Sequence, residues 1–223
     1  KELVDQVSDN VADWIFGREA QWKAFIDLND EWEAKFIKRM VELFDEQEAE
    51  ILSNMGKTKG VVRKDQVDFW VFGLNRWEDK YEEAAKELYT GAIVDNGSRV
   101  MGELPVVGVS FDQYDPRVTT AVNERAFRFR DVSTTTAQTV RSTLMEGLEK
   151  GEGIPELKKR VQNTFRFARE TRAPMIARTE TIHATNAAAE MSYMQSGVVE
   201  GKEWLCEFSK RTCSFCMDMN GKT

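Results

Sequence analysis

The chain has 223 residues, with 38 acidic and 31 basic side chains, 41% hydrophobic residues, one histidine and three cysteines. This length is enough to bury a substantial core, and no apolar run approaches the roughly 18 residues that a membrane span needs. Three cysteines exclude a secreted scaffold held by several disulfides. A single histidine, His183, excludes a metal centre that this chain builds from several histidines.

The net charge of −7 is unevenly distributed along the chain. Residues 1–116 carry 14 basic and 25 acidic side chains, whereas residues 117–223 carry 17 basic and 13 acidic ones. An acidic first part and a basic second part indicate two surfaces with different partners. The alternative is that both are solvated faces of one helical protein.

Residues 11–53 are predicted to form one or two long amphipathic helices. Gly17 is a candidate interruption, and Gly56 is expected to end the run. Apolar side chains recur there at three- and four-residue steps: Trp14, Ile15, Trp22, Phe25, Ile26, Trp32, Phe36, Met40, Leu43 and Phe44. So many aromatic residues favour a bundle core over a helix-docking surface.

A second helical stretch is predicted from about Lys64 to Thr90. Residues 91–115 are rich in Gly and Val and lack helical periodicity, which predicts a long loop with at most one short strand. This segment marks the best internal boundary. The sequence therefore predicts an acidic, aromatic-rich helical region over residues 1–110 and a second domain over residues 111–223.

The second domain is predicted to be a series of capped helices. Asp115-Pro116 combines a capping residue with a proline at the first helical position, Ser133 or Thr134 opens the next helix, and Gly151 and Gly197 are typical terminators. The expected helices cover about 115–130, 133–150, 154–165 and 173–195. Residues 198–208 are expected to form a β-hairpin, so the predicted fold is mainly α with a small β element near Trp204.

Glu180 occupies an unusual position in the last of these helices. At 100° per residue it shares a stripe with apolar and small residues: Ile176, Ala184, Ala187, Met191 and Met194. A carboxylate there needs a partner, and Arg211 is the first candidate, with Arg172 and Arg178 as local alternatives. A buried ion pair is favoured over a catalytic base supported by His183 or Arg178, because no nucleophile or second carboxylate converges on this position by spacing.

The three cysteines lie near the C-terminal end. Cys213 and Cys216 form a C-x-x-C pair, which is typical of half a zinc site, of a redox pair, or of two unrelated thiols. Half a zinc site fits this helical chain better than a thioredoxin-type pair does. Cys206 would supply a third ligand, and His183 a fourth only if the fold brings it close.

From about Phe111 to Lys222 the chain resembles the head-morphogenesis domain of tailed phages, the Mu F-like minor head protein family. The resemblance depends on a block from Ile176 to Asn186 and on a second block from Trp204 to Cys216. The family motif residues are Arg178, Thr179, Glu180, Asn186, Trp204 and Arg211. Two departures are Ser209, where the family commonly has an acidic residue, and the missing His-Pro-x-Cys-type segment after Gly221, which suggests a C-terminally truncated domain.

The resemblance implies a non-enzymatic minor capsid component inside the virion or procapsid, present in the host cytoplasm during assembly and part of a multi-copy assembly. It also implies association with the portal and other capsid components, and help in procapsid assembly or DNA packaging and ejection. Residues 1–110 match no motif, and they are expected to dock on a portal or to derive from one.

A basic stretch in the second domain gives independent support for contact with DNA. Residues 117–178 carry 13 basic and 7 acidic side chains, which would attract phosphate without base specificity. The candidates are Arg125, Arg128, Arg130, Lys158, Lys159, Arg160, Arg166 and Arg169. The alternative is that these side chains pair with the acidic first half or with acidic neighbours in an assembly.

Two other functions stay open at this point. One is a zinc-dependent interaction module with Cys206, Cys213 and Cys216 as ligands. The other is an enzyme or toxin-linked domain with a site around Arg178 and Glu180, although the set of catalytic groups is incomplete.

Overall fold

The computed structural model describes residues 2–58, 60, 62–71, 74–202 and 212–222, and in these residues it is helical without a strand. The fold is therefore mainly α, as the sequence predicts. The first part contains α1 (Glu2–Gly56), α2 (Lys64–Val71) and α3 (Leu74–Glu103). The second part contains α4 (Pro116–Arg128), α5 (Arg130–Glu149), α6 (Ile154–Phe167), a π-helical turn η1 (Ala168–Arg172), α7 (Ala173–Ser196) and α8 (Ser214–Met219).

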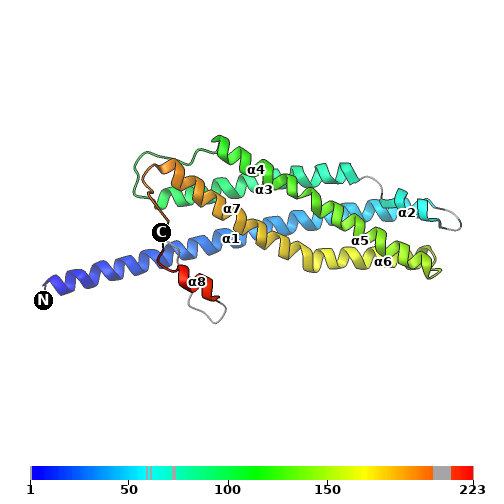
Figure 1. Ribbon diagram of the computed structural model, residues 1–223, viewed down its shortest axis with the longest axis horizontal. Helices are drawn as coiled ribbons and strands as arrows, with labels where there is room; N and C mark the ends of the chain where they lie inside the picture. Colours follow the sequence, from blue (N-terminus) through cyan, green and yellow to red (C-terminus); the bar gives the residue numbers. More distant parts are fainter. Residues whose placement is uncertain (1, 59, 61, 72–73, 203–211, 223) are drawn as a thin grey trace.

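The helices form an elongated bundle along α1 (Figure 1). Helix α7 packs against both α1 and α3, while α5 packs against α3 and α6. The turn η1 joins α6 to α7, so these elements follow one another without a loop. In Figure 1 the N-terminal part of α1 extends past the neighbouring helices of the bundle.

One hydrophobic cluster includes side chains from both parts of the chain. The ring of Phe36 on α1 lies 5.4 Å from that of Tyr89 on α3 and 6.4 Å from that of Phe129, which lies between α4 and α5. Further along, Phe44 on α1 contacts Phe165 on α6, with ring centroids 6.4 Å apart. Both parts contribute to this core, so the core does not mark a boundary at residue 111. The division into two domains stays a prediction.

The loop predicted over residues 91–115 is wrong for its first half, since α3 continues to Glu103. A Cβ atom at Gly91 would lie 2.3 Å from the ring of Trp32, and one at Gly97 would lie 2.6 Å from the ring of Phe111. These glycines allow aromatic rings to approach the helix backbone, and they do not end the helix. The predicted loop is correct for residues 104–115.

Most helix boundaries in the second half follow their sequence signals. Gly151 and Gly197 have φ angles of 74° and 66°, the left-handed conformation that ends a helix. However, α5 begins at Arg130 and not at Ser133 or Thr134. Ser133 is buried within α5, so the threonine-rich segment continues a helix that has already started.

Two further predictions concern the ends of the chain. Gly17 does not interrupt α1, which runs unbroken to Gly56, the predicted end. Residues 198–202 of the expected β-hairpin have no strand structure, and residues 203–211, including Trp204, lie outside the described residues. No described helix combines the length and apolar character that crossing a bilayer requires.

Asp115 caps α4 as its sequence position predicts. Its carboxylate accepts hydrogen bonds from the backbone N–H of Arg117 at 2.8 Å and from the Arg117 guanidinium at 2.6 Å. These bonds lower the pKa of Asp115 to about 2. Because this pKa lies below the value of about 3.9 for an unfolded aspartate, ionised Asp115 stabilises the fold above that value, and the stabilisation is lost as the pH falls through about 2.

The Asp115→Asn variant is therefore expected to lose less stability than the natural chain between pH 4 and pH 2. Urea unfolding midpoints of both proteins, measured at pH 6, 4 and 2, test this expectation. Parallel pH profiles would contradict a role for the charge of Asp115 in capping α4.

Candidate functional site

The central polar feature of the bundle is an ion pair between α4 and α7. Glu180 on α7 is 9% exposed and has Ala177 and Ala184, both buried, on the adjacent turns of its own face. The Glu180 carboxylate accepts two hydrogen bonds from the guanidinium of Arg125 on α4, from Nε at 2.6 Å and from Nη2 at 2.7 Å. The Arg125 Nε also donates to the hydroxyl of Tyr89 on α3 at 3.3 Å. This two-point geometry fixes how α4 sits on α7.

The sequence points to a buried carboxylate but not to this partner. Arg211, the first candidate, lies outside the described residues. Arg172 instead donates from Nη1 to the Thr136 hydroxyl at 2.9 Å and lies over the ring of Phe44. Arg178 is exposed. Arg125 is a predicted nucleic-acid contact, but its guanidinium is bound to Glu180 and Tyr89 within the protein.

Burial shifts the pKa of both members of this pair. It raises the pKa of Glu180 to about 7 and lowers the pKa of the Arg125 guanidinium. Both shifts express the cost of taking a charge out of water, which the partner of opposite charge offsets. Since the Glu180 oxygens are occupied by Arg125, the arrangement supports a structural role for this carboxylate better than a role as a general base.

The other family motif residues lie away from the core. Arg178, Thr179 and Asn186 are exposed on the outer side of α7, and the Thr179 hydroxyl donates to the carbonyl of Met175 at 2.9 Å. His183 is also exposed. Trp204 belongs to the segment that is not described. The structure therefore does not bring Arg178 together with Glu180 in one site.

Half of the candidate nucleic-acid residues pair within the protein. Arg130 forms ion pairs with three carboxylates of α3, those of Glu78, Asp79 and Glu82, at 2.8–3.0 Å. Arg169 pairs with Asp45 and Glu48 of α1. Arg160 and Arg125 pair with Glu152 and Glu180 of the second half itself. Arg130 and Arg169 of the basic second half thus neutralise acidic side chains of the first half.

The remaining candidates differ from this group. Among the residues that the structure describes, these four form no ion pair: Arg128, Lys158, Lys159 and Arg166. Arg128 lies on α4, and the other three lie on α6. Three of them are exposed, and Lys158 is half-buried.

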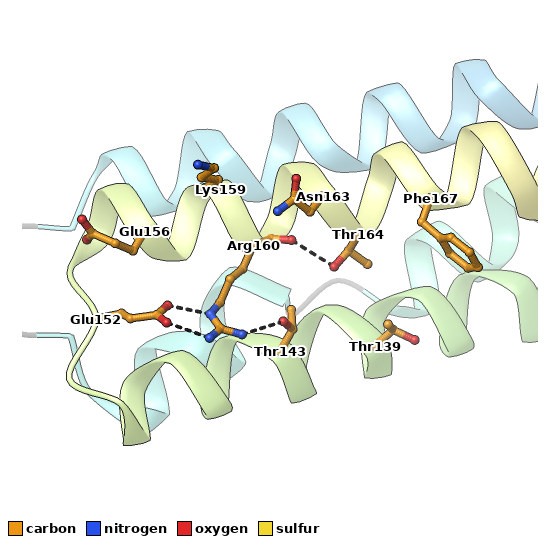
Figure 2. Close-up of a pocket in the computed structure, with 9 residues that line it drawn as sticks. All are labelled: Thr139, Thr143, Glu152, Glu156, Lys159, Arg160, Asn163, Thr164 and Phe167. Atoms are coloured by element: carbon orange, nitrogen blue, oxygen red, sulfur yellow. Dashed lines mark hydrogen bonds and ion pairs between the residues drawn. The ribbon is translucent and has the colours of Figure 1, made fainter.

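A groove of about 600 Å³ lies between α5 and α6 (Figure 2). Arg160 extends across it, donating to both carboxylate oxygens of Glu152 at 2.6 and 2.7 Å and to the Thr143 hydroxyl at 3.3 Å. This pairing lowers the pKa of Glu152 and raises that of Arg160. The other lining residues are Thr139, Glu156, Lys159, Asn163, Thr164 and Phe167. Two of the charged side chains that line the groove, Arg160 and Glu152, are therefore engaged with each other.

The cysteine pair lies at the start of α8. The Cys213 thiol donates a hydrogen bond to the Cys216 sulfur at 3.4 Å, and the two residues are not joined by a disulfide. Hydrogen bonding to Cys216 lowers the pKa of the Cys213 thiol. Cys206, the third predicted ligand, lies outside the described residues, and within the described ones no group of three metal-binding side chains is found.

Fold and site together define a helical bundle protein with one hydrophobic core and an ion pair at the contact between α4 and α7. Residues 138–223 match the family described as Phage Mu protein F like protein. The chain thus carries a Phage Mu protein F-like domain over these residues, and the resemblance seen in the sequence is confirmed there. The matched range starts within α5 and includes α6, η1, α7 and α8. Neither the curated proteins nor the solved structures give a significant match.

Proposed function

We propose that this protein is a minor capsid component of a tailed phage and acts in head morphogenesis within the virion or procapsid. The observation that carries the proposal is the Phage Mu protein F-like domain over residues 138–223. The internal engagement of Glu180 with Arg125 supports an assembly role in preference to catalysis.

The proposed partners are the portal and other capsid components, in a multi-copy assembly that promotes procapsid formation or DNA packaging and ejection. The exposed motif residues of α7 support this proposal. Arg178, Thr179 and Asn186 make no contribution to the core, although they belong to the most distinctive block of the sequence. Exposed polar residues of this kind are suited to contacts with a neighbouring protein.

Non-specific contact with packaged DNA is a secondary part of the proposal. Lys158, Lys159 and Arg166 of α6, which form no ion pair within the described part of the chain, support it. Three phosphate contacts would give weak binding that falls steeply with salt concentration.

Co-sedimentation of the purified chain with assembled portal rings of the same phage tests the proposal. We expect the natural chain to sediment with the ring, and an Arg178→Glu/Asn186→Lys variant to stay in the supernatant. Both positions are exposed, so the variant is expected to fold. The matched control is Glu190→Lys, an exposed residue of the same helix outside the motif block.

The assembly function and the DNA contact are tested separately. Failure of the natural chain to bind the portal or any other capsid component would contradict the assembly function. Loss of binding to linear duplex DNA at 50 mM salt, without loss of portal binding, in a Lys158→Glu/Lys159→Glu/Arg166→Glu variant would support the DNA contact. Unchanged DNA binding in this variant would contradict it.

A further inference from the structure

A cavity of about 200 Å³ lies between α3, α4 and α7, beside the Arg125–Glu180 pair. Tyr89 and Ile93 of α3 and Ala184 of α7 line it, and each of these residues is 1% exposed. The side chains of Ala121, Ala184 and Ala187 complete an apolar wall. The cavity is therefore apolar on most of its surface.

The polar side of the cavity is mainly basic. Arg125, Arg128 and His183 line it, with Glu124 as the acidic residue of the lining. Glu180 is not among the lining residues, and its carboxylate is bound to Nε and Nη2 of Arg125. Among the described residues the Arg125 Nη1 donates no hydrogen bond, and Arg128 forms no ion pair. These donors are available to a ligand.

We propose that this cavity binds a carboxylate carried on a small apolar body, with the carboxylate held by Arg125, Arg128 and His183 and the apolar body against Tyr89 and Ile93. A guanidinium presents its donors in a planar fork that matches the two oxygens of a carboxylate. The apolar wall excludes a bare hydrated anion as the best ligand, since such an anion leaves that surface unused and loses its own hydration.

The electrostatics of His183 agree with this geometry. Partial desolvation of the exposed ring, and then the charges of Arg125 and Arg128, lower the pKa of the imidazole. A carboxylate bound between these groups favours the imidazolium, so binding is expected to raise the pKa of His183. This inference does not depend on the proposed function, because the site belongs to the chain alone and is tested without portal, capsid or DNA.

The test uses the intact chain and benzoate as the probe. Since His183 is the sole histidine, its imidazole carbon-bound protons give one set of NMR signals that reports directly on the cavity. We expect saturable shifts of these signals on titration with benzoate, and a pKa of His183 that is higher by about half a unit or more at saturation. Inorganic phosphate at the same ionic strength is expected to bind more weakly.

Three variants locate the binding. Arg128→Gln removes an exposed donor and is expected to weaken benzoate binding at least about tenfold. Ala187→Leu keeps every charge and fills the cavity, and it is expected to abolish binding. Arg166→Gln removes another exposed arginine, on α6, and is expected to bind benzoate like the natural chain.

The proposal is overturned if the His183 signals do not respond to benzoate in saturable fashion. Equal affinity of the natural chain and Arg128→Gln would also overturn it. Binding of phosphate as tight as that of benzoate would overturn the assignment of an apolar carboxylate. Circular dichroism and urea unfolding of each variant establish that lost binding is not lost folding.

Discussion

Replacing Glu180 with alanine is expected to lower the free energy of unfolding by about 3–5 kcal/mol. The reason is that Arg125 would keep its charge inside the bundle without a counter-charge. The side chains of Arg125 and Glu180 are only 23% and 12% exposed, so water replaces the lost carboxylate poorly. For a chain of this size the loss corresponds to a decrease in Tm of roughly 10 °C. Urea unfolding followed by circular dichroism measures it.

Two further variants separate the ion pair from the loss of side-chain volume. The double variant Arg125→Met/Glu180→Leu removes both charges and keeps apolar volume, and its stability is expected to lie close to that of the natural chain. Glu190→Ala breaks the ion pair with Lys202, whose two side chains are 53% and 56% exposed, and it is expected to cost less than about 1 kcal/mol. An unchanged Tm in Glu180→Ala would show that Arg125 is solvated in its absence.

The double variant Arg125→Met/Glu180→Leu also addresses the enzyme hypothesis. Glu180 is the one buried carboxylate that the sequence suggested as a general base. If Arg125→Met/Glu180→Leu folds and associates with portal rings like the natural chain, a catalytic function of this carboxylate is not needed for assembly. Loss of association in a stable double variant would instead show that the pair does more than hold α4 against α7.

Local signals predicted the helices of the second half well. Asp115-Pro116 specifies a helix start because the carboxylate can accept from the backbone of the first turn. Gly151 and Gly197 specify helix ends because their left-handed φ angles are strained for other residues. Each of these signals acts over a few residues, so a single sequence contains the whole argument.

Signals that depend on tertiary contacts were misinterpreted. The Gly- and Val-rich composition predicts a loop at Gly91 and Gly97, yet both lie within α3 at positions where an aromatic ring leaves no room for a Cβ atom. A helical pattern exists in the same segment, since Ala92, Ile93, Asn96 and Val100 are all buried. Asn96 obscures this pattern because it is a polar residue at a buried position. Its burial is possible because its amide donates a hydrogen bond to the carbonyl of Ala92.

The candidate site was predictable in part. A carboxylate within an apolar stripe identified Glu180, because that rule needs only helical periodicity. The partner Arg125 lies 55 residues earlier in the chain, and its identity depends on how α4 is placed on α7, which periodicity does not specify. For the same reason the basic residues could be counted, but not divided into those that pair internally and those that do not.

The largest effect is expected from isolating the family-matched segment. A fragment of residues 138–223 is expected not to fold cooperatively, because its main helix packs against helices that the fragment lacks. Thr185 of α7 donates to the Asn29 side chain of α1 at 2.7 Å, and Ser192 donates to the carbonyl of Gly97 in α3 at 3.0 Å. Without α1 and α3, the buried face of α7 would be exposed to water.

Thermal unfolding followed by circular dichroism measures this outcome. The full chain is expected to melt in one cooperative transition, whereas the fragment is expected to have weak helical signal and no transition. Adding a second fragment of residues 1–137, which supplies α1, α3, α4 and the first part of α5, is expected to restore helical signal and a cooperative melt. A cooperative transition of the fragment alone would contradict the prediction. It would show that the Phage Mu protein F-like domain is stable without α1 and α3, even though its buried face packs against them in the full chain.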